Sequence, residues 1–139
     1  MRYLLLILLF LICLKSVAQY DFKNGYDPLL FSFIEVESKW MPDTINALGY
    51  VGILQIGHVM IEEVNRICRI KKIDKYYVIN DALDVRKSVE IWYLVQRYWN
   101  PKYQFRKAIK VWNPTASKKY RVKLEKAFEN VVIENYFNN

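Results

Sequence analysis

The chain has 139 residues, a formal net charge of +7, 53% hydrophobic residues and one histidine. This length suits one domain with a single core. The positive charge fits a polyanionic partner such as nucleic acid, an anionic membrane or bacterial cell wall, although ordinary solubility is an equally simple explanation. His58 has no Cys or His neighbours at ligand spacing and no accompanying Ser or Cys motif, which excludes a zinc site and a nucleophile triad of the usual kinds.

The first eighteen residues have the pattern of an export signal. Met1–Tyr3 is basic, residues 4–14 are an unbroken apolar run, and Ser16–Ala18 supplies small residues at the cleavage spacing. We therefore expect a secretory signal peptide over residues 1–18 and export to the periplasm or cell envelope. The apolar run is too short to span a bilayer, which takes about twenty residues. An uncleaved anchor is the alternative.

The signal is followed by a polar lead-in over residues 19–26 and by the predicted domain over residues 27–139. Removal of the signal leaves Cys68 as the only cysteine, so no intramolecular disulfide is expected. Cys68 lies in an apolar helical pattern and is predicted to be a small core residue. This is compatible with export, because disulfides are an option in oxidising compartments and not a requirement.

The first predicted helix carries a carboxylate among apolar side chains. Asp27 and Pro28 are typical of a helix start. Pro42 disfavours helical geometry in the residue before it, Met41, where the helix is expected to end. Steps of three and four residues place Glu37 in the middle of the apolar face. That face is defined by Leu30, Phe33, Ile34, Trp40 and Met41.

The position of Glu37 gives its carboxyl group unusual chemistry. A carboxylate on a core-facing stripe is costly to ionise without partners, so burial raises its pKa. A raised pKa makes Glu37 a candidate general acid near neutral pH. The alternative is a structural Glu37 bound to a backbone N–H or a basic side chain, since structural ion pairs also shift pKa values. Glu35 points to nearly the opposite side and is expected to be solvated.

A loop with two glycines follows this helix. Residues 43–50 are expected to be irregular, and Gly49 and Gly52 predict tight turns or a close approach of the backbone to a ligand. Residues 51–56 are predicted to include a short extended piece. His58 is expected to be a partly exposed residue at the start of the next helix.

Four further helices complete the predicted fold. Val95 and Trp99 share the apolar face of the second of them. The resulting fold class is mainly α: a single compact helical domain with a small loop or extended region beside the helix that carries Glu37. The predicted helices cover Val59–Arg69, Asp84–Trp99, Tyr103–Trp112 and Ser117–Phe137.

Glu37 opens a motif of fixed spacing that ends at Ile56. Glu37-Ser38 begins it, Asn46 lies within it, and the run Gly52-Ile53-Leu54-Gln55-Ile56 closes it. This motif resembles the catalytic core of the soluble lytic transglycosylases, relatives of goose-type lysozyme. In that family Glu-Ser is followed a few positions on by an aromatic or apolar residue and Pro, and then by Ser, Gly and Gly-Leu-Met-Gln-Ile. The spacing from Glu37 to Gln55 matches this pattern without a gap. Asn46 stands where the family has Ser. The intervening motif positions are held by Trp40, Pro42 and Gly49.

Three later segments resemble the family more weakly. Asp81–Leu94 is similar to a family helix but has Val85 and Val89 where the family has Asn and Gly. Ala108–Asn113 resembles the Ala-x-Tyr-Asn-x-Gly segment, with Pro114-Thr115 in place of the final Gly. The motif that closes the family pattern, Tyr-x-x-Lys-Val, is similar to Tyr120-Arg121-Val122.

The resemblance implies an α+β, lysozyme-like fold and a peptidoglycan substrate. It implies that Glu37 alone protonates the bridging oxygen between N-acetylmuramic acid and N-acetylglucosamine. Glu37 then takes a proton from the C6 hydroxyl that attacks C1, which leaves a 1,6-anhydro ring. No metal, cofactor or second carboxylate is required.

The resemblance also implies a set of substrate-binding residues. Gln55 is expected to face the sugar, for which an amide offers both a donor and an acceptor. The alternative for Gln55 is an amide that stabilises the turn. Asn46 is expected to orient Glu37, as the family's Ser does, and Asn113 is expected to contact substrate. Trp112 and Tyr120 are candidate platforms for sugar rings.

Other functions stay open on the sequence alone. Water as the nucleophile would make the chain a lysozyme-like hydrolase, with Asp43 as the candidate second carboxylate. A degenerate module would bind cell wall, or a secretion or conjugation apparatus, without cutting it. Nucleic-acid binding has no supporting motif. The expected partner is the peptidoglycan glycan strand, and the expected state is a monomer.

Overall fold

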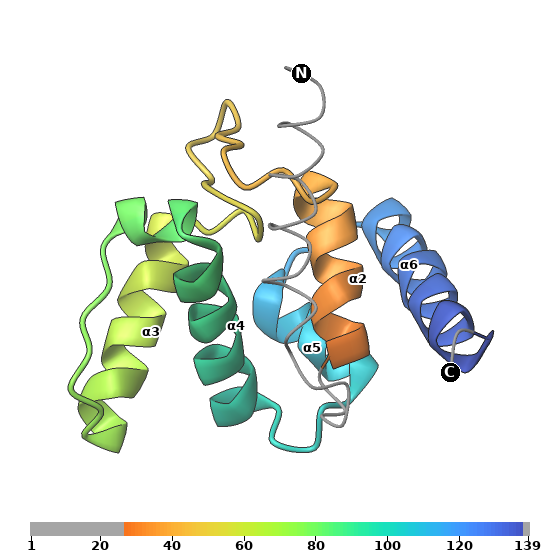
Figure 1. The fold of residues 1–139 in the computed structure, drawn as a ribbon. Coiled ribbons are helices and arrows are strands. Elements are labelled where there is room, and N and C mark those ends of the chain that lie inside the picture. Colours follow the sequence, from red (N-terminus) through yellow and green to blue (C-terminus); the bar gives the residue numbers. More distant parts are fainter. Residues whose placement is uncertain (1–26, 138–139) are drawn as a thin grey trace, which may run out of the picture.

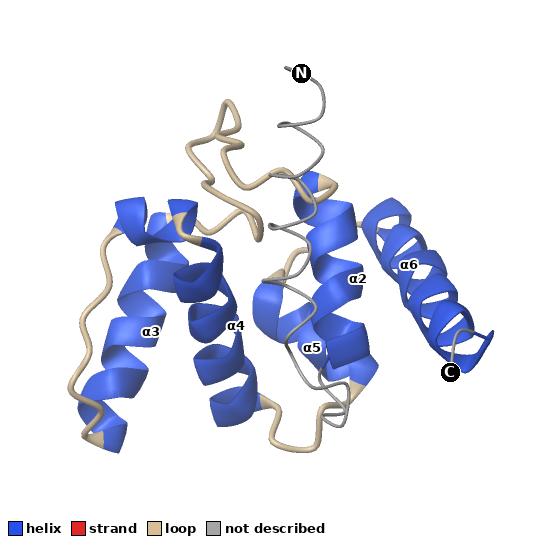
Figure 2. Cartoon of the chain, viewed as in Figure 1, coloured by secondary structure: helices blue, strands red, loops and turns tan. Residues whose placement is uncertain are grey.

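The computed structural model describes residues 27–137, which form five α-helices and a short 3-10 helix (Figures 1 and 2). The mainly helical class is therefore confirmed. The predicted signal peptide and the lead-in lie outside the described residues. No helix within the described range combines the length and apolar character needed to cross a membrane. The elements are α2 (Asp27–Ser38), α3 (His58–Lys71), η1 (Ile79–Leu83), α4 (Val85–Trp99), α5 (Phe105–Trp112) and α6 (Lys118–Phe137).

Helix α2 is the centre of the fold. Figure 1 shows it between α6 on one side and the pair α4 and α5 on the other, and α2 packs along α6. The Phe33 ring lies 5.8 Å from the Trp92 ring of α4 and 6.5 Å from the Trp112 ring of α5, measured between centroids. Because helices surround it, α2 buries apolar residues on more than one face. Its fully buried side chains include Leu29, Leu30, Phe33 and Ile34.

The end of α2 was predicted three residues too late. The helix ends at Ser38, and Lys39 and Trp40 take left-handed backbone angles, with φ of 51° and 65°. This reversal returns the Trp40 indole to the helix, where its Nε1 donates to Glu35 Oε2 at 2.7 Å. Met41, predicted on the apolar face, is therefore 55% exposed.

The segment between α2 and α3 is a loop built on tight turns. The extended piece predicted over residues 51–56 is wrong, because only the isolated bridges Ile45–Val51 and Val51–Ile56 form there. Gly49 and Gly52 both have left-handed backbones, with φ of 81° and 80°. The close approach predicted for a glycine is made to protein backbone, since Gly52 lies against Ala82 of η1.

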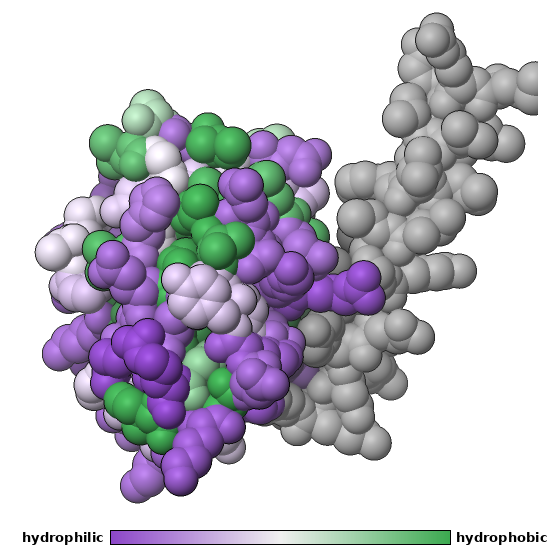
Figure 3. All heavy atoms as spheres, turned by 90° about the vertical axis from the view of Figure 1, so that its left-hand side faces the viewer, coloured by the Kyte–Doolittle hydropathy of each residue, from purple (hydrophilic) through white to green (hydrophobic). Residues whose placement is uncertain are grey.

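Helices α3, α4 and η1 pack together as a second group beside α2. The connection from α3 to η1 is fixed by Asn65, whose amide donates to Tyr77 O and accepts from Tyr77 N, both at 2.8 Å. Asp84 caps α4 by accepting from Arg86 N at 2.8 Å. Figure 3 views the molecule from the side of α3 and shows mostly hydrophilic side chains with apolar groups between them.

The remaining helices differ from the predictions mainly at their ends. Cys68 is buried in α3, as predicted. Helix α5 begins at Phe105, two residues after the predicted Tyr103, which instead has a left-handed backbone with φ of 41°. Trp99 was predicted on the inner face of α4 but is 46% exposed, and its indole nitrogen donates to Glu63 of α3 at 2.7 Å.

The two glycines give a matched test of this loop. A Cβ at Gly52 would lie 1.7 Å from Ala82 O, whereas a Cβ at Gly49 would have no neighbour within 4 Å. Gly49→Ala should lower the free energy of unfolding by about 1 kcal/mol, the cost of a left-handed alanine. Gly52→Ala should lower it by more than about 3 kcal/mol, because backbone must also move. Urea denaturation measures both, and equal losses would contradict the close approach.

Candidate active site

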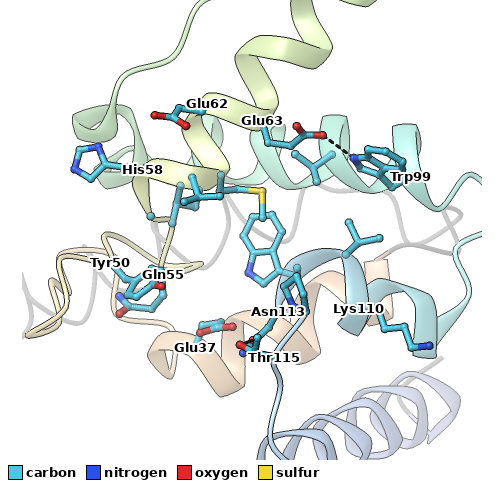
Figure 4. A pocket seen from close by; sticks show the side chains of 18 of the residues that line it. Glu37, Tyr50, Gln55, His58, Glu62, Glu63, Trp99, Lys110, Asn113 and Thr115 are labelled. Carbon is cyan, nitrogen blue, oxygen red and sulfur yellow. Dashed lines mark hydrogen bonds between the residues drawn. The ribbon is translucent and has the colours of Figure 1, made fainter.

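A cleft of about 1610 Å³ runs between the α2–α3 loop, α3, the end of α4, α5 and the start of α6. Figure 4 looks into this cleft, with Glu37 on one wall and α3 on the opposite wall. The six residues predicted for the single-carboxylate reaction and for substrate binding all line it, although they come from four separate segments. They are Glu37, Asn46, Gln55, Trp112, Asn113 and Tyr120.

Glu37 lies in the last turn of α2 and is partly buried in the wall of the cleft. Burial raises the pKa of Glu37 from its ordinary value of 4.5 to about 7, while a hydrogen bond from Tyr120 acts in the opposite direction. The carboxyl group is therefore close to half protonated at neutral pH, which is the condition for a general acid that must also act as a base. Glu35 is exposed, as predicted.

Tyr120, in the first turn of α6, is the partner of the acid. Its hydroxyl donates a hydrogen bond to Glu37 Oε1. Burial, and then the neighbouring carboxylate, raise the pKa of Tyr120, so the hydroxyl keeps its proton. The Asn113 side chain is hydrogen-bonded to Tyr120 in turn. Tyr120 was predicted as a platform for sugar rings, but its hydroxyl holds the acid, and Asn113 supports that hydroxyl.

Asn46 does not orient Glu37, so that prediction is wrong. Its Oδ1 accepts hydrogen bonds from Leu48 N at 2.9 Å and Tyr50 N at 3.0 Å. An Asn side chain that bonds amides two and four residues later stabilises its own turn. Asn46 therefore shapes the loop that forms one end of the cleft, and the role expected of it belongs to Tyr120.

The Gln55 amide stabilises the loop, and the same side chain lines the cleft. Its Nε2 donates to Thr44 O at 3.1 Å and to Gly52 O at 3.0 Å, which braces the loop. Its backbone is left-handed, with φ of 49°. Figure 4 shows the side chain next to Tyr50, above Glu37. The amide nitrogen is committed to the loop, so Oε1 is the atom that Gln55 can offer to a ligand.

The aromatic surfaces of the cleft differ from those predicted. Trp112 is only 8% exposed and packs edge-on against Phe33, which makes it mainly a core residue. Tyr50 and Trp99 also line the cleft and are 42% and 46% exposed. The sequence did not identify either as a site residue, because Trp99 has the spacing of a core residue and Tyr50 lies in a loop. Their aromatic type was the only available signal.

The carboxylates that face Glu37 come from α3. Asp43, the candidate second carboxylate of the hydrolase alternative, is exposed and is not among the residues that line the cleft. Glu62 and Glu63 do line it, and Figure 4 shows them on the wall opposite Glu37. The hydrogen bonds from Arg66 lower the pKa of Glu63, which stays ionised. Glu62 is exposed.

No cluster of His, Cys, Asp and Glu within residues 27–137 has the arrangement of a metal site. His58 begins α3 and is exposed, and it lines the cleft at the end nearest the α2–α3 loop. The described part of the cleft therefore contains the Glu37 carboxyl group, whose pKa is near neutral pH, and the Tyr120 phenol that is hydrogen-bonded to it. It also contains exposed aromatic rings and charged groups on α3 and α5.

The raised pKa of Glu37 predicts a measurable pH dependence of stability. The unfolded chain ionises this carboxyl near 4.5 and the folded chain near 7, so the folded state loses stability as the pH rises through that interval. Glu37→Gln should therefore raise the free energy of unfolding by about 2 kcal/mol at pH 8, with partial solvent exposure taken into account. At pH 4 the difference should nearly vanish.

Chemical denaturation at the two pH values measures this difference, and Glu35→Gln is the matched control on the exposed side of α2. A gain from Glu37→Gln that does not change between pH 4 and pH 8 would show that the Glu37 carboxyl has an ordinary pKa.

Comparison of the chain with protein-family models, curated proteins and solved structures found no match. The functional conclusion therefore depends on the chemistry of the cleft and on the motif around Glu37. Both identify the same residue, one from its burial and hydrogen bonding and the other from its spacing to Gln55.

Proposed function

We propose that this chain is an exported lytic transglycosylase that cleaves the β-1,4 bond between N-acetylmuramic acid and N-acetylglucosamine in peptidoglycan. The observation that carries the proposal is the Glu37 carboxyl group, which lies in the wall of a cleft with a pKa of about 7 and a phenol bonded to it. The motif from Glu37 to Ile56, which resembles that family's catalytic core, supports the same assignment.

The proposed reaction uses one carboxyl group twice. Protonated Glu37 gives its proton to the bridging oxygen as the bond from that oxygen to C1 of the muramic acid breaks. The resulting carboxylate then accepts the proton of the C6 hydroxyl while the C6 oxygen bonds to C1. The products are a 1,6-anhydro-muramic end and a free 4-hydroxyl on N-acetylglucosamine, and Glu37 regains its proton. The reaction consumes no water.

The surroundings of Glu37 suit both halves of this cycle. Burial favours the protonated acid of the first half, and the Tyr120 hydroxyl stabilises the carboxylate that the first half produces. A pKa near the working pH keeps both forms accessible. The loop braced by Asn46 and Gln55 keeps its backbone in place without help from substrate. The exposed rings of Tyr50 and Trp99 offer apolar faces to sugar rings.

A hydrolase is the second candidate, and the two carboxylates on α3 favour it. Glu62 and Glu63 line the cleft opposite Glu37, which is where an inverting enzyme carries the base that activates water. The salt bridge from Arg66 occupies Glu63 at 2.7 Å, which leaves Glu62 as the freer base. A non-catalytic module that binds cell wall or an envelope apparatus would need no acid at all.

Product analysis separates these functions. Purified peptidoglycan digested with the protein should yield 1,6-anhydro-muramic ends, detected by mass spectrometry. Glu37→Gln should reduce their rate of formation by about a thousandfold, because the proton donor is lost. The control Glu35→Gln, on the exposed side of the same helix, should retain activity.

Reducing ends in place of anhydro ends would identify water as the nucleophile, and Glu62→Gln would then be expected to abolish them. No product from the wild type, together with retained binding to wall, would overturn the enzymatic proposal and leave the binding module.

The hydrogen bond from Tyr120 predicts a change in the pH profile of activity. The acid form of Glu37 is lost as the pH rises through about 7, so kcat/KM should fall on that side. Tyr120→Phe removes a donor that favours the ionised carboxylate, so the falling limb should move to higher pH, and kcat should drop about tenfold.

The control for this variant is Tyr76→Phe, at a position that is 76% exposed on the α3–η1 connection. A Tyr120→Phe enzyme with reduced kcat but an unmoved limb would mean that Tyr120 only packs beside the acid.

A further inference from the structure

One end of the molecule gathers exposed cations from three helices. Figure 1 places the last turn of α3, the last turn of α4, the α4–α5 connection and the start of α5 at the same end, away from the α2–α3 loop, and α4 packs against both α3 and α5. The lower part of Figure 3 shows strongly hydrophilic side chains at this end, with an apolar group between them. We call this surface the basic end and define it by the exposed side chains of Arg69, Lys71, Lys72, Arg97, Lys102 and Arg106.

Acidic residues do not neutralise the basic end. The sequence has no Asp or Glu over residues 91–124. None of the six cations forms a salt bridge within the part of the chain that the structure describes. Glu63 of α3 is already occupied by Arg66 at 2.7 Å. Asp74, two residues after Lys72, is exposed and opposes only part of the positive charge.

Aromatic and apolar side chains lie among these cations. Trp99 is 46% exposed, Ile70 is 52% exposed and Tyr103 is 53% exposed. The Lys71 ammonium lies 5.6 Å from the centre of the Tyr98 ring. Trp and Tyr combine an apolar ring with a polar edge, and they concentrate with Lys and Arg where lipid headgroups meet acyl chains. The basic end therefore has the composition of a surface that contacts a bilayer.

The described chain also begins at the basic end. Figure 1 shows the start of α2 beside the α4–α5 connection, and Asp27 accepts a hydrogen bond from the Tyr93 hydroxyl of α4. In the sequence, residues 15–26 join this point to the apolar run over residues 4–14. An uncleaved anchor, the alternative to a signal peptide, would therefore join the fold at the end that carries the cations.

We propose that the basic end docks on a lipid bilayer that contains anionic lipids. The Lys and Arg side chains lie at the headgroups, and Trp99 and Ile70 lie at the boundary with the acyl chains. Glu37 lies about 15 Å along α2 from Asp27, so the candidate acid stays clear of the bilayer. The proposal concerns where the protein is held and does not depend on the reaction at Glu37.

The arrangement of the cations favours a bilayer over nucleic acid. Nucleic acid presents a line of phosphates, and affinity for it grows with the number of phosphates contacted along that line. The cations of the basic end are instead collected around the ends of three helices. An exposed isoleucine at position 70 adds affinity only where an apolar phase is available to bury it.

The charge of the basic end is tested by sedimentation of the full chain with vesicles of phosphatidylcholine, prepared with and without phosphatidylglycerol. Lys72→Gln with Lys102→Gln removes two of its cations, neither of which lines the cleft. This variant should bind vesicles that contain phosphatidylglycerol about tenfold more weakly, and its binding to neutral vesicles should change by less than about twofold. High salt should remove the difference.

The apolar part of the basic end is tested by Ile70→Ser. Loss of the side chain should weaken binding to both kinds of vesicle about threefold to fivefold, because less apolar surface is buried. The matched control is Ile45→Ser on the α2–α3 loop, at the opposite end of the molecule, where the isoleucine is 61% exposed. Equal losses from the two substitutions would contradict docking through the basic end.

The matched control for charge is Lys123→Gln with Lys126→Gln, which removes two exposed cations from α6. Equal weakening by both lysine pairs would overturn the proposal in favour of overall charge. Full binding by every variant would overturn it in favour of attachment through residues outside the described range. Circular dichroism checks that each variant is folded.

Other polyanions are distinguished by the same variants. Duplex DNA or purified peptidoglycan that the wild type binds in preference to vesicles, and that Lys72→Gln with Lys102→Gln binds poorly, would overturn the bilayer in favour of that polyanion.

Discussion

The packing of α2 along α6 is the constraint on which the rest of the site depends. It brings Tyr120 to Glu37, which is 83 residues away in the sequence, and the Tyr120 hydroxyl donates a hydrogen bond to the Glu37 carboxyl group. Without that contact Glu37 would be a buried carboxyl with no donor, and such groups are destabilising when ionised. With it, the same group has a pKa of about 7 and a hydrogen bond that suits its charged form.

The loop next to the acid holds its own shape through its own polar groups. Asn46 and Gln55 use their side-chain amides on loop backbone, and Gly52 allows that loop to lie against η1. A site preorganised in this way spends less substrate binding energy on ordering itself. Exposed aromatic rings and charged side chains of α3 and α5 line the same cleft.

Local patterns in the sequence predicted much of this fold, because they report local physics. The inward direction of Glu37 follows from helical periodicity. The turns at Gly49 and Gly52 follow from backbone freedom. The extended piece over residues 51–56 failed because Gly52 and Gln55 have left-handed backbones, so the segment turns and closes on itself through the isolated bridge Val51–Ile56.

The features that the sequence could not predict depend on contacts between distant segments. Asn46 was assigned to the acid by its position in a motif, but two amides within its own loop compete for its side chain. The aromatic ring of Tyr120 suggested stacking on a sugar ring. Only the packing of α6 on α2 brings its hydroxyl to the Glu37 carboxylate. The half-exposed position of Trp99, where its indole bonds to Glu63 of α3, also depends on a contact between separate helices, which helical periodicity does not encode.

The most direct measurement is the titration of the Glu37 side-chain carboxyl carbon by nuclear magnetic resonance, with the signal assigned by its loss in Glu37→Gln. A midpoint near pH 7 in the folded protein is the result expected of a carboxyl group that burial keeps protonated and that serves as both acid and base. A midpoint near its ordinary value of 4.5 would contradict this, because the group would then be ionised at neutral pH and unable to donate the proton that cleavage requires.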